Sequence, residues 1–203
     1  QEVALPLPTI VREMLLRDAQ RAAQPKGATP QWVWDESPQG DEEVFFRRRF
    51  QLPNVPERAE LIVSCDNHCR VYVNGEKVVQ SDAWEVPAMA NVQKVLRAGE
   101  NVLAVHGSND GGVAGLVLRI TWSTGDQRGE LVTDASWRCT SDDPDGWNNT
   151  GFDDAKWSRV TVLAALGANG APWSGTLGED SLGSAVPPDA PQVAVAAVGL
   201  QGP

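Results

Sequence analysis

The chain has 203 residues and carries 27 acidic against 17 basic side chains, a formal net charge of −10. This balance argues against a nucleic-acid partner, because phosphate binding needs clustered lysine and arginine. No apolar run approaches the ~20 residues that a membrane helix needs, so we expect no membrane span. Basic residues cluster once, at Arg47, Arg48 and Arg49. Alternation along a strand would divide them between two faces, which favours a solvated or edge strand over an anion site.

The first periodic segment is residues 9–23, where apolar side chains recur at helical spacing. Thr9 can cap this helix, and Pro25 lies where it should end. We therefore expect residues 1–30 to form an N-terminal helical extension, which packs loosely or connects to something upstream.

Strands follow at residues 31–34 and 43–52, and residues 61–80 predict three short strands joined by two tight turns. The second turn, Asn74-Gly75, is the stronger signal, because a type I′ hairpin needs positive φ at both central residues. The first turn is Asp66-Asn67-His68. Pairing the flanking strands about it makes every inward position apolar, so we expect a second hairpin here.

In that hairpin Cys65 and Cys69 would be cross-strand neighbours. Such neighbours could meet the Cα separation of ~4.4 to 6.8 Å that a disulfide requires, and two small buried thiols are the alternative. A CxxxC spacing without a second pair is a poor zinc signal, and the chain has no CxxCH motif for covalent haem.

Short strands with frequent turn signals continue to residue 122, interrupted by an irregular crossover that contains Trp84. This pattern favours a β-sandwich over βαβ units. In the looser stretch from 129 to 173, we expect Trp137 and Trp157 in the core or between sheets. Residues 176–203 are rich in Gly, Ala and Pro with little periodicity, which predicts a linker or irregular tail.

Several segments, taken in order, resemble the galactose-binding-like jelly-roll domains. They are Trp32-Val33-Trp34, Phe46-Arg47-Arg48-Arg49-Phe50, Ser64-Cys65-Asp66-Asn67, Val71-Tyr72-Val73-Asn74-Gly75, and residues 99–105, 112–118, 133–138 and 152–157. The set is similar to the sugar-binding modules of bacterial α-L-rhamnosidases and to related domains of large secreted bacterial proteins. The resemblance implies an all-β, antiparallel jelly-roll β-sandwich over residues 31–175, usually without catalysis of its own.

In the rhamnose-binding modules, an Asp-Asn pair at this tip helps to hold a calcium ion that grips the sugar, and Asp66-Asn67 occupies the matching place. Sugar recognition uses planar hydrogen-bonding groups and an apolar face, and calcium adds oxygen coordination. The candidate carbohydrate-binding residues are Asp66, Asn67, Trp84 and Asn109, which converge if the crossover folds over the tip. The alternative for Asp66 and Asn67 is a turn in which both side chains satisfy backbone groups.

For the two histidines and one acidic loop, a structural role is favoured over a catalytic or metal-binding role. His68 and His106 lack a neighbouring nucleophile motif, so ordinary turn and strand roles are favoured over acid-base or metal roles. The acidic loop at residues 141–146 partly imitates a calcium loop, but Phe152 stands where the twelfth-position Glu should be. A solvated loop is therefore expected there.

The leading hypothesis is a non-catalytic carbohydrate-binding module that anchors a larger secreted, periplasmic or cell-surface protein to a polysaccharide. The alternative is a protein-interaction or spacer domain without sugar binding, joined to catalytic or electron-transfer domains. A glycosidase is the third hypothesis, but sequence spacing cannot establish the ~5 to 9.5 Å carboxylate separation that hydrolysis needs.

Overall fold

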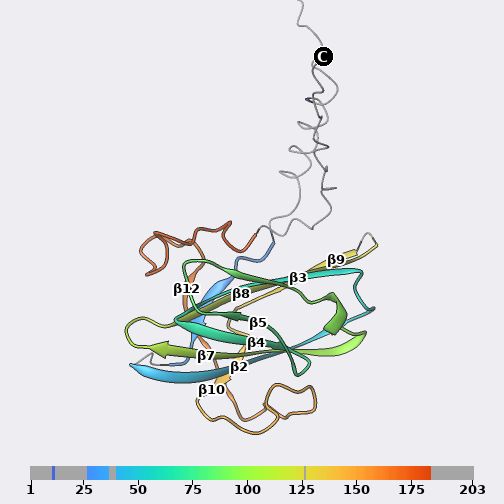
Figure 1. Ribbon diagram of the computed structural model, residues 1–203, viewed down its shortest axis with the longest axis horizontal. Helices are drawn as coiled ribbons and strands as arrows, with labels where there is room; N and C mark the ends of the chain where they lie inside the picture. Colours follow the sequence, from blue (N-terminus) through green and yellow to red (C-terminus); the bar gives the residue numbers. More distant parts are fainter. Residues whose placement is uncertain (1–10, 12–26, 37–39, 126, 184–203) are drawn as a thin grey trace, which may run out of the picture.

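A computed structural model describes residues 11, 27–36, 40–125 and 127–183 of the chain (Figure 1). They form two antiparallel sheets that pack face to face, with a single short 3₁₀ turn, η1 (Gln93–Val95), between described strands. The all-β, two-sheet prediction is confirmed. Apart from Val11, the helix predicted over residues 9–23 lies outside the described residues. Within the described part of the chain, no helix is long and apolar enough to cross a membrane.

The first sheet, sheet A, has the order β12-β1-β8-β3-β6, and β9 also pairs with β8. Its strands are β1 (Gln31–Trp34), β3 (Arg58–Asp66), β6 (Ala88–Asn91), β8 (Gly115–Thr124), β9 (Gln127–Val132) and β12 (Thr161–Ala165). The second sheet, sheet B, has the order β11-β10-β2-β7-β4-β5. Its strands are β2 (Asp41–Leu52), β4 (His68–Val73), β5 (Glu76–Ser81), β7 (Gly99–Asp110), β10 (Arg138–Thr140) and β11 (Ser158–Arg159).

The core lies between the two sheets and follows from strict alternation along the strands. Apolar side chains of both inner faces are fully buried, among them Leu61, Val63, Val71, Val73, Leu103, Val105, Leu116, Leu118 and Ile120. Trp137 is also fully buried in this core, as expected. Trp157 instead lies half-buried on the outer face of sheet B, against Phe152.

The two turns of residues 61–80 have different roles. Asn74-Gly75 joins β4 to β5 as an antiparallel hairpin, with Asn74 at φ 53° and Gly75 at φ 90°, as predicted. The hairpin expected at Asp66-Asn67 is wrong, because β3 pairs in sheet A whereas β4 pairs in sheet B. The apolar side chains of β3 and β4 do face one core, as predicted, but that core lies between two sheets. The Asp66-Asn67 turn carries the chain from one sheet to the other.

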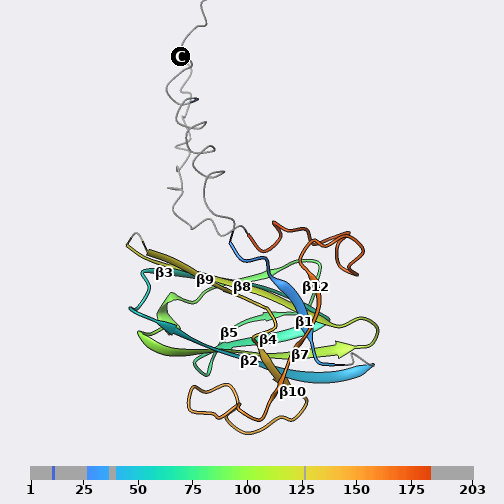
Figure 2. The same ribbon diagram turned by 180° about the vertical axis from the view of Figure 1, so that it is seen from behind.

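Residues 166–183 fold back over the outer face of sheet A (Figures 1 and 2). Their buried side chains join Trp32 and Val117 in a second apolar cluster, and they are Leu166, Trp173, Leu177 and Leu182. Residues 176–183 therefore pack on the sandwich, although a linker was expected from 176 onward. Residues 184–203 of that expected tail lie outside the described residues.

Candidate functional site

The Asp66-Asn67 turn closes one end of the sandwich, between the end of β3 and the start of β4. Asn67 is bound to the end of β7 on both sides of Asn109. Its backbone N–H donates to the Ser108 carbonyl oxygen at 3.1 Å, and its Oδ1 accepts from the Asp110 N–H at 2.8 Å. The Asp66-Asn67 peptide bond is cis. The turn is thus fixed to sheet B by two hydrogen bonds.

The Asp66 carboxylate is held from the other side of the molecule. Its Oδ2 accepts a hydrogen bond of 3.0 Å from the indole Nε1 of Trp173. Trp173 is itself buried and stacked on Trp32, with ring centroids 4.0 Å apart. Burial raises the pKa of Asp66 and the charge of Glu85 adds to the rise, while the Trp173 hydrogen bond opposes it. A ligand with positive charge would therefore relieve an unfavourable carboxylate environment.

Asn109 lies beside this turn and is only 2% exposed. Its Nδ2 donates to the Gly40 carbonyl oxygen at 2.9 Å. Its Oδ1 is buried and has no hydrogen-bond partner among the described residues. A buried acceptor left unpaired costs free energy, so this oxygen is a place where a bound group would be stabilising.

Trp84 also lies at this end of the sandwich. Its carbonyl oxygen accepts a 2.6 Å hydrogen bond from Ser64, two residues before Asp66. Its half-buried indole packs against the cluster that contains Trp32 and Trp173. The structure thus places all four residues named from the sequence at one end. The contact between Trp173 and Asp66 could not be predicted, because no local pattern links two residues 107 positions apart.

Of the two alternatives for Cys65 and Cys69, the structure shows two free, buried thiols and no disulfide between them. The premise of a disulfide was the hairpin between β3 and β4, whereas the two cysteines extend from different sheets into the shared core. The Cys65 side chain makes a hydrogen bond with Cys69, and burial raises the pKa of the Cys65 thiol well above its usual value. Burial likewise raises the pKa of Cys139 to about 12. The Cys65 and Cys139 thiols therefore stay protonated at neutral pH and behave as small apolar side chains.

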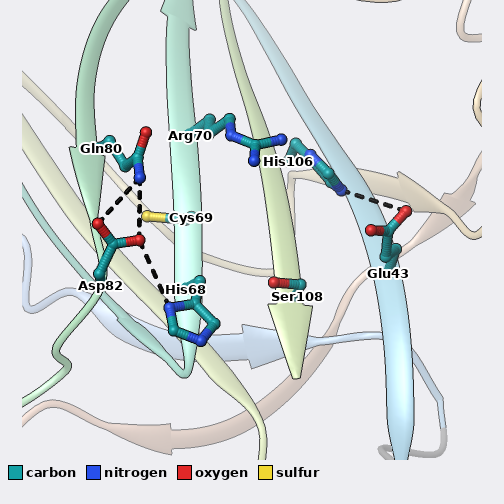
Figure 3. Close-up of a pocket in the computed structure, with 8 residues that line it drawn as sticks. All are labelled: Glu43, His68, Cys69, Arg70, Gln80, Asp82, His106 and Ser108. Carbon is teal, nitrogen blue, oxygen red and sulfur yellow. Dashed lines mark hydrogen bonds and ion pairs between the residues drawn. The ribbon is translucent and has the colours of Figure 1, made fainter. Parts of the chain in front are cut away.

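A polar pocket of about 160 Å³ opens next to the turn, on the outer face of sheet B (Figure 3). It is lined by Glu43, His68, Cys69, Arg70, Gln80, Asp82, His106 and Ser108. None of the four residues named from the sequence lines it, but His68 directly follows Asn67. His68 Nε2 lies 2.9 Å from Asp110 Oδ2, and its Nδ1 lies 3.5 Å from Asp82 Oδ1. His68 therefore connects the turn to the pocket.

On the side of the pocket away from the turn, an aromatic side chain packs against the lining residue His106. The His106 ring stacks on Phe45, with centroids 4.6 Å apart and planes 3° from parallel. Its Nε2 lies 3.5 Å from Glu43 Oε2 (Figure 3). Gln80 on the opposite wall donates to both carboxylate oxygens of Asp82 at 3.0 and 2.9 Å. The pocket thus presents planar hydrogen-bonding groups in fixed orientations.

Metal coordination by acidic, histidine and cysteine side chains alone finds no support here. Across residues 27–36, 40–125 and 127–183, no three such side chains gather in a way that could hold an ion. The acidic loop at 141–146 is largely exposed, in agreement with a solvated loop. A calcium ion at the turn would have to draw on amide and carbonyl oxygens in addition to the Asp66 carboxylate.

No protein-family profile matches the chain. A curated relative, an α-L-rhamnosidase of Streptomyces avermitilis, is 34% identical over 157 residues, which is 70% of this chain and 15% of the relative. The crystal structure of an S. avermitilis α-L-rhamnosidase complexed with L-rhamnose matches with a TM-score of 0.69 and 31% identity, over 77% of this chain and 16% of that one.

A lectin from Pleurotus ostreatus, solved in complex with GalNAc, matches with a TM-score of 0.63 and 26% identity. The match covers 72% of this chain and 45% of the lectin chain. A rhamnosidase of family GH78 from a Bacillus species, at 22% identity, supports the fold alone. The chain therefore resembles one module of α-L-rhamnosidases, and it spans about one-seventh of the length of the curated relative.

Proposed function

We propose that this chain is a non-catalytic carbohydrate-binding module with a galactose-binding-like jelly-roll fold, and that it anchors a larger extracytoplasmic protein to a polysaccharide. Two relatives support this reading, one solved with L-rhamnose and one with GalNAc. The short stretch of the rhamnosidase that the chain matches suits an accessory module, with catalysis elsewhere in such a protein. Further domains of the same polypeptide are its expected partners, together with the carbohydrate.

The observation that carries the proposal is the unpaired oxygen of Asn109 beside the Asp66-Asn67 turn. Calcium takes six to eight oxygen ligands from carboxylates, amides, carbonyls and waters. Asp66 and Asn109 would supply a carboxylate and an amide oxygen to such an ion, and Asn67 would add its own polar groups. When bound there, calcium would offer open coordination positions to sugar hydroxyls. It would also neutralise a carboxylate whose pKa burial has raised.

Sugar specificity would come from the groups around that centre. The indole of Trp84 is half-buried, so part of it remains accessible to the C–H surface of a sugar ring. The pocket beyond His68 would receive further hydroxyls, because its carboxylate, imidazole and amide groups both donate and accept hydrogen bonds. A neighbouring residue of a polysaccharide could occupy this pocket while the first residue contacts the turn.

Isothermal titration calorimetry of the 203-residue chain tests the proposal with L-rhamnose and GalNAc as probes, in calcium and in EGTA. We expect binding of at least one sugar in calcium, and loss of that binding in EGTA or in Asp66→Ala. Asp143→Ala is the matched control, because Asp143 is an exposed aspartate in the loop at 141–146. Absence of sugar binding in calcium, across these probes and a wider set of plant, algal and bacterial sugars, would reject the proposal.

One observation favours the alternative, a spacer or protein-interaction domain without sugar binding. Asp66 Oδ2 and Asn67 Oδ1 already accept hydrogen bonds from Trp173 and Asp110, as in a turn that only satisfies its own chain. On this reading Asp66→Ala lowers the thermal midpoint equally with and without calcium. On the carbohydrate-binding reading, calcium raises the midpoint of the unmodified chain but not that of the variant.

A further inference from the structure

A second charged cluster lies at the β10–β11 edge of sheet B, away from the Asp66-Asn67 turn. Three arginines face one another across adjacent strands: Arg138 on β10 is the register partner of Arg47 on β2 and of Arg159 on β11. Like charges directly opposite in a sheet are destabilising. Three in a row therefore need compensation from other groups.

A pocket of about 130 Å³ lies at this cluster. Its charged lining consists of Arg47, Arg48, Arg49, Arg138, Arg159 and Asp154. Five arginines and one aspartate thus line one pocket in a chain whose formal net charge is −10. Glu100 approaches from the rim, with its Oε1 3.8 Å from Arg49 Nη1. Positive charge remains in excess even when both carboxylates are counted.

Arg47 is used by the fold itself. It is buried, its Nε lies 2.9 Å from Asp154 Oδ2, and its Nη1 donates to the Trp147 and Asn149 carbonyl oxygens. It thereby holds the loop at residues 147–154 on sheet B. Burial lowers the pKa of Arg47, against the opposing effect of Asp154. Arg47 therefore forms the floor of the pocket and is not the group that a ligand would contact first.

Arg49 pairs with Glu100 and with Asp154, at 3.8 and 3.6 Å, whereas Arg138 and Arg159 donate hydrogen bonds to carbonyl oxygens. Arg138 Nη1 donates to the Trp157 carbonyl oxygen at 2.7 Å, and Arg159 Nη1 donates to that of Ser136. Carbonyl oxygens satisfy N–H groups but do not neutralise the charge. Arg48 Nε is buried and has no hydrogen-bond partner within the described ranges. Arg48 lines the same pocket from the side of β2 opposite to Arg47 and Arg49.

We propose that this pocket binds an oxyanion, the carboxylate or sulfate group of an acidic polysaccharide. The planar guanidinium fork matches such oxygens in bidentate geometry. Arg159 also lines an adjacent cavity of about 260 Å³, together with Trp157, Lys156 and the acidic residues Asp35 and Glu36. An aromatic ring next to an anion pocket suits a charged sugar, because the ring can pack on the sugar face. Only the choice of a polysaccharide as carrier rests on the proposed function.

The test measures binding of the full chain to polygalacturonate, which carries carboxylates, to dextran sulfate, which carries sulfates, and to neutral dextran. Fluorescence titrations at low and high salt follow the affinity. We expect at least one polyanion to bind, neutral dextran not to bind, and the affinity to fall as salt rises. The polymer that binds more tightly identifies the oxyanion.

The variants are Arg48→Gln and Arg159→Gln, with Arg128→Gln as the control of equal charge change. Arg128 is exposed on β9 of the other sheet. We expect about a tenfold loss of affinity for each pocket variant, and a loss for Arg159→Lys because lysine lacks the fork. Arg159 is exposed, so its replacement leaves the fold intact even if Arg48→Gln does not fold.

No polyanion binding by the unmodified chain, or equal losses in Arg128→Gln and Arg159→Gln, would overturn the inference. Asp66→Ala separates it from the proposed function, because that variant should lose the calcium-dependent binding of neutral sugars and keep the polyanion. If the neutral sugars never bind but the polyanion does so through Arg159, the anion pocket stands without the proposal for the turn.

Discussion

The two ends of β7 each carry a buried asparagine, but only one of them is fully hydrogen-bonded. Asn101, at the end near the Asn74-Gly75 hairpin, donates to the carbonyl oxygens of Arg97 and Gly99 and accepts from the Arg97 N–H and from Asn74 Nδ2. Asn109, at the opposite end, donates to Gly40 and leaves its Oδ1 unpaired.

The difference in hydrogen bonding between Asn101 and Asn109 distinguishes polar groups that only stabilise the fold from polar groups that are free to bond a ligand. Asn74 extends the bonded end, since its Nδ2 donates to the Val95 carbonyl oxygen and its Oδ1 accepts from the Val102 N–H. A buried group that is completely satisfied stabilises one conformation and has nothing left for a ligand. An end with an unsatisfied oxygen and an unfavourably placed carboxylate gains stability only when something binds.

Replacing Asn101 with alanine should have the largest effect. The change removes four hydrogen bonds, to Asn74 and to backbone groups of Arg97 and Gly99, so we expect a loss of about 3 kcal/mol in the free energy of unfolding. Asn109→Ala removes one hydrogen bond and should cost only about 1 kcal/mol in EGTA. Urea denaturation compares the two, and equal costs would show that the ends do not differ as described.

The hairpin itself gives the next largest effect. Gly75→Val places a branched side chain at φ 90°, and the new Cβ would also displace Asn149 Oδ1, the end of an exposed side chain. We expect about 2 kcal/mol of destabilisation, because left-handed backbone is strained for such residues. Gly111→Val is a useful control: its φ is 117°, but nothing lies within 4 Å of the added Cβ. A larger cost at Gly111 would contradict the importance of the contact.

A smaller, pH-dependent effect is expected at Asp66. Burial raises the pKa of Asp66 in the folded state above the value of about 3.9 that it has in the unfolded chain. Protonated Asp66 therefore stabilises the fold fully below the unfolded pKa, and this stabilisation is lost as pH rises through the folded pKa. In EGTA, the stability of the unmodified chain relative to Asp66→Asn should therefore fall between pH 4 and 7. Urea titrations at several pH values measure it, and a rise over this range would refute the stated sign.

The smallest effect should come from His68→Gln. His68 pairs with Asp110 and Asp82, but these side chains are 39%, 67% and 63% exposed. Exposed ion pairs contribute little, so we expect a change in unfolding free energy of about 0.5 kcal/mol or less. A change above about 2 kcal/mol would mean that His68 supports the turn rather than the pocket.

Local patterns predicted much of the fold. Alternation identified the strands and core faces, and the Asn74-Gly75 signal identified the hairpin, since both depend on residues close in sequence. Alternation does not say to which sheet a strand belongs, which is why the Asp66-Asn67 turn was mistaken for a hairpin. The alignment of Arg47, Arg138 and Arg159 across three strands could not be predicted either, because these strands lie far apart in the chain.

The candidate site was predicted only in part, for a similar reason. Asp66, Asn67, Trp84 and Asn109 do lie at one end, but their roles remain predictions. The pocket beside His68 and the Trp173 contact depend on tertiary packing. Composition alone did not predict that residues 176–183 pack on the sandwich. Leu177 and Leu182 are buried there, although the segment is rich in glycine.

The hydrogen bond from Trp173 to Asp66 has a consequence for how such a domain can diversify. The indole that bonds the carboxylate belongs to residues 166–183, a segment that lies far downstream in the chain and covers the outer face of sheet A, the sheet that contains β3. If the turn binds sugar as proposed, substitutions in that segment would change affinity while every residue of the turn stays the same. A library designed to alter the proposed ligand preference should therefore include this segment, and a transplanted domain should extend through Gly183.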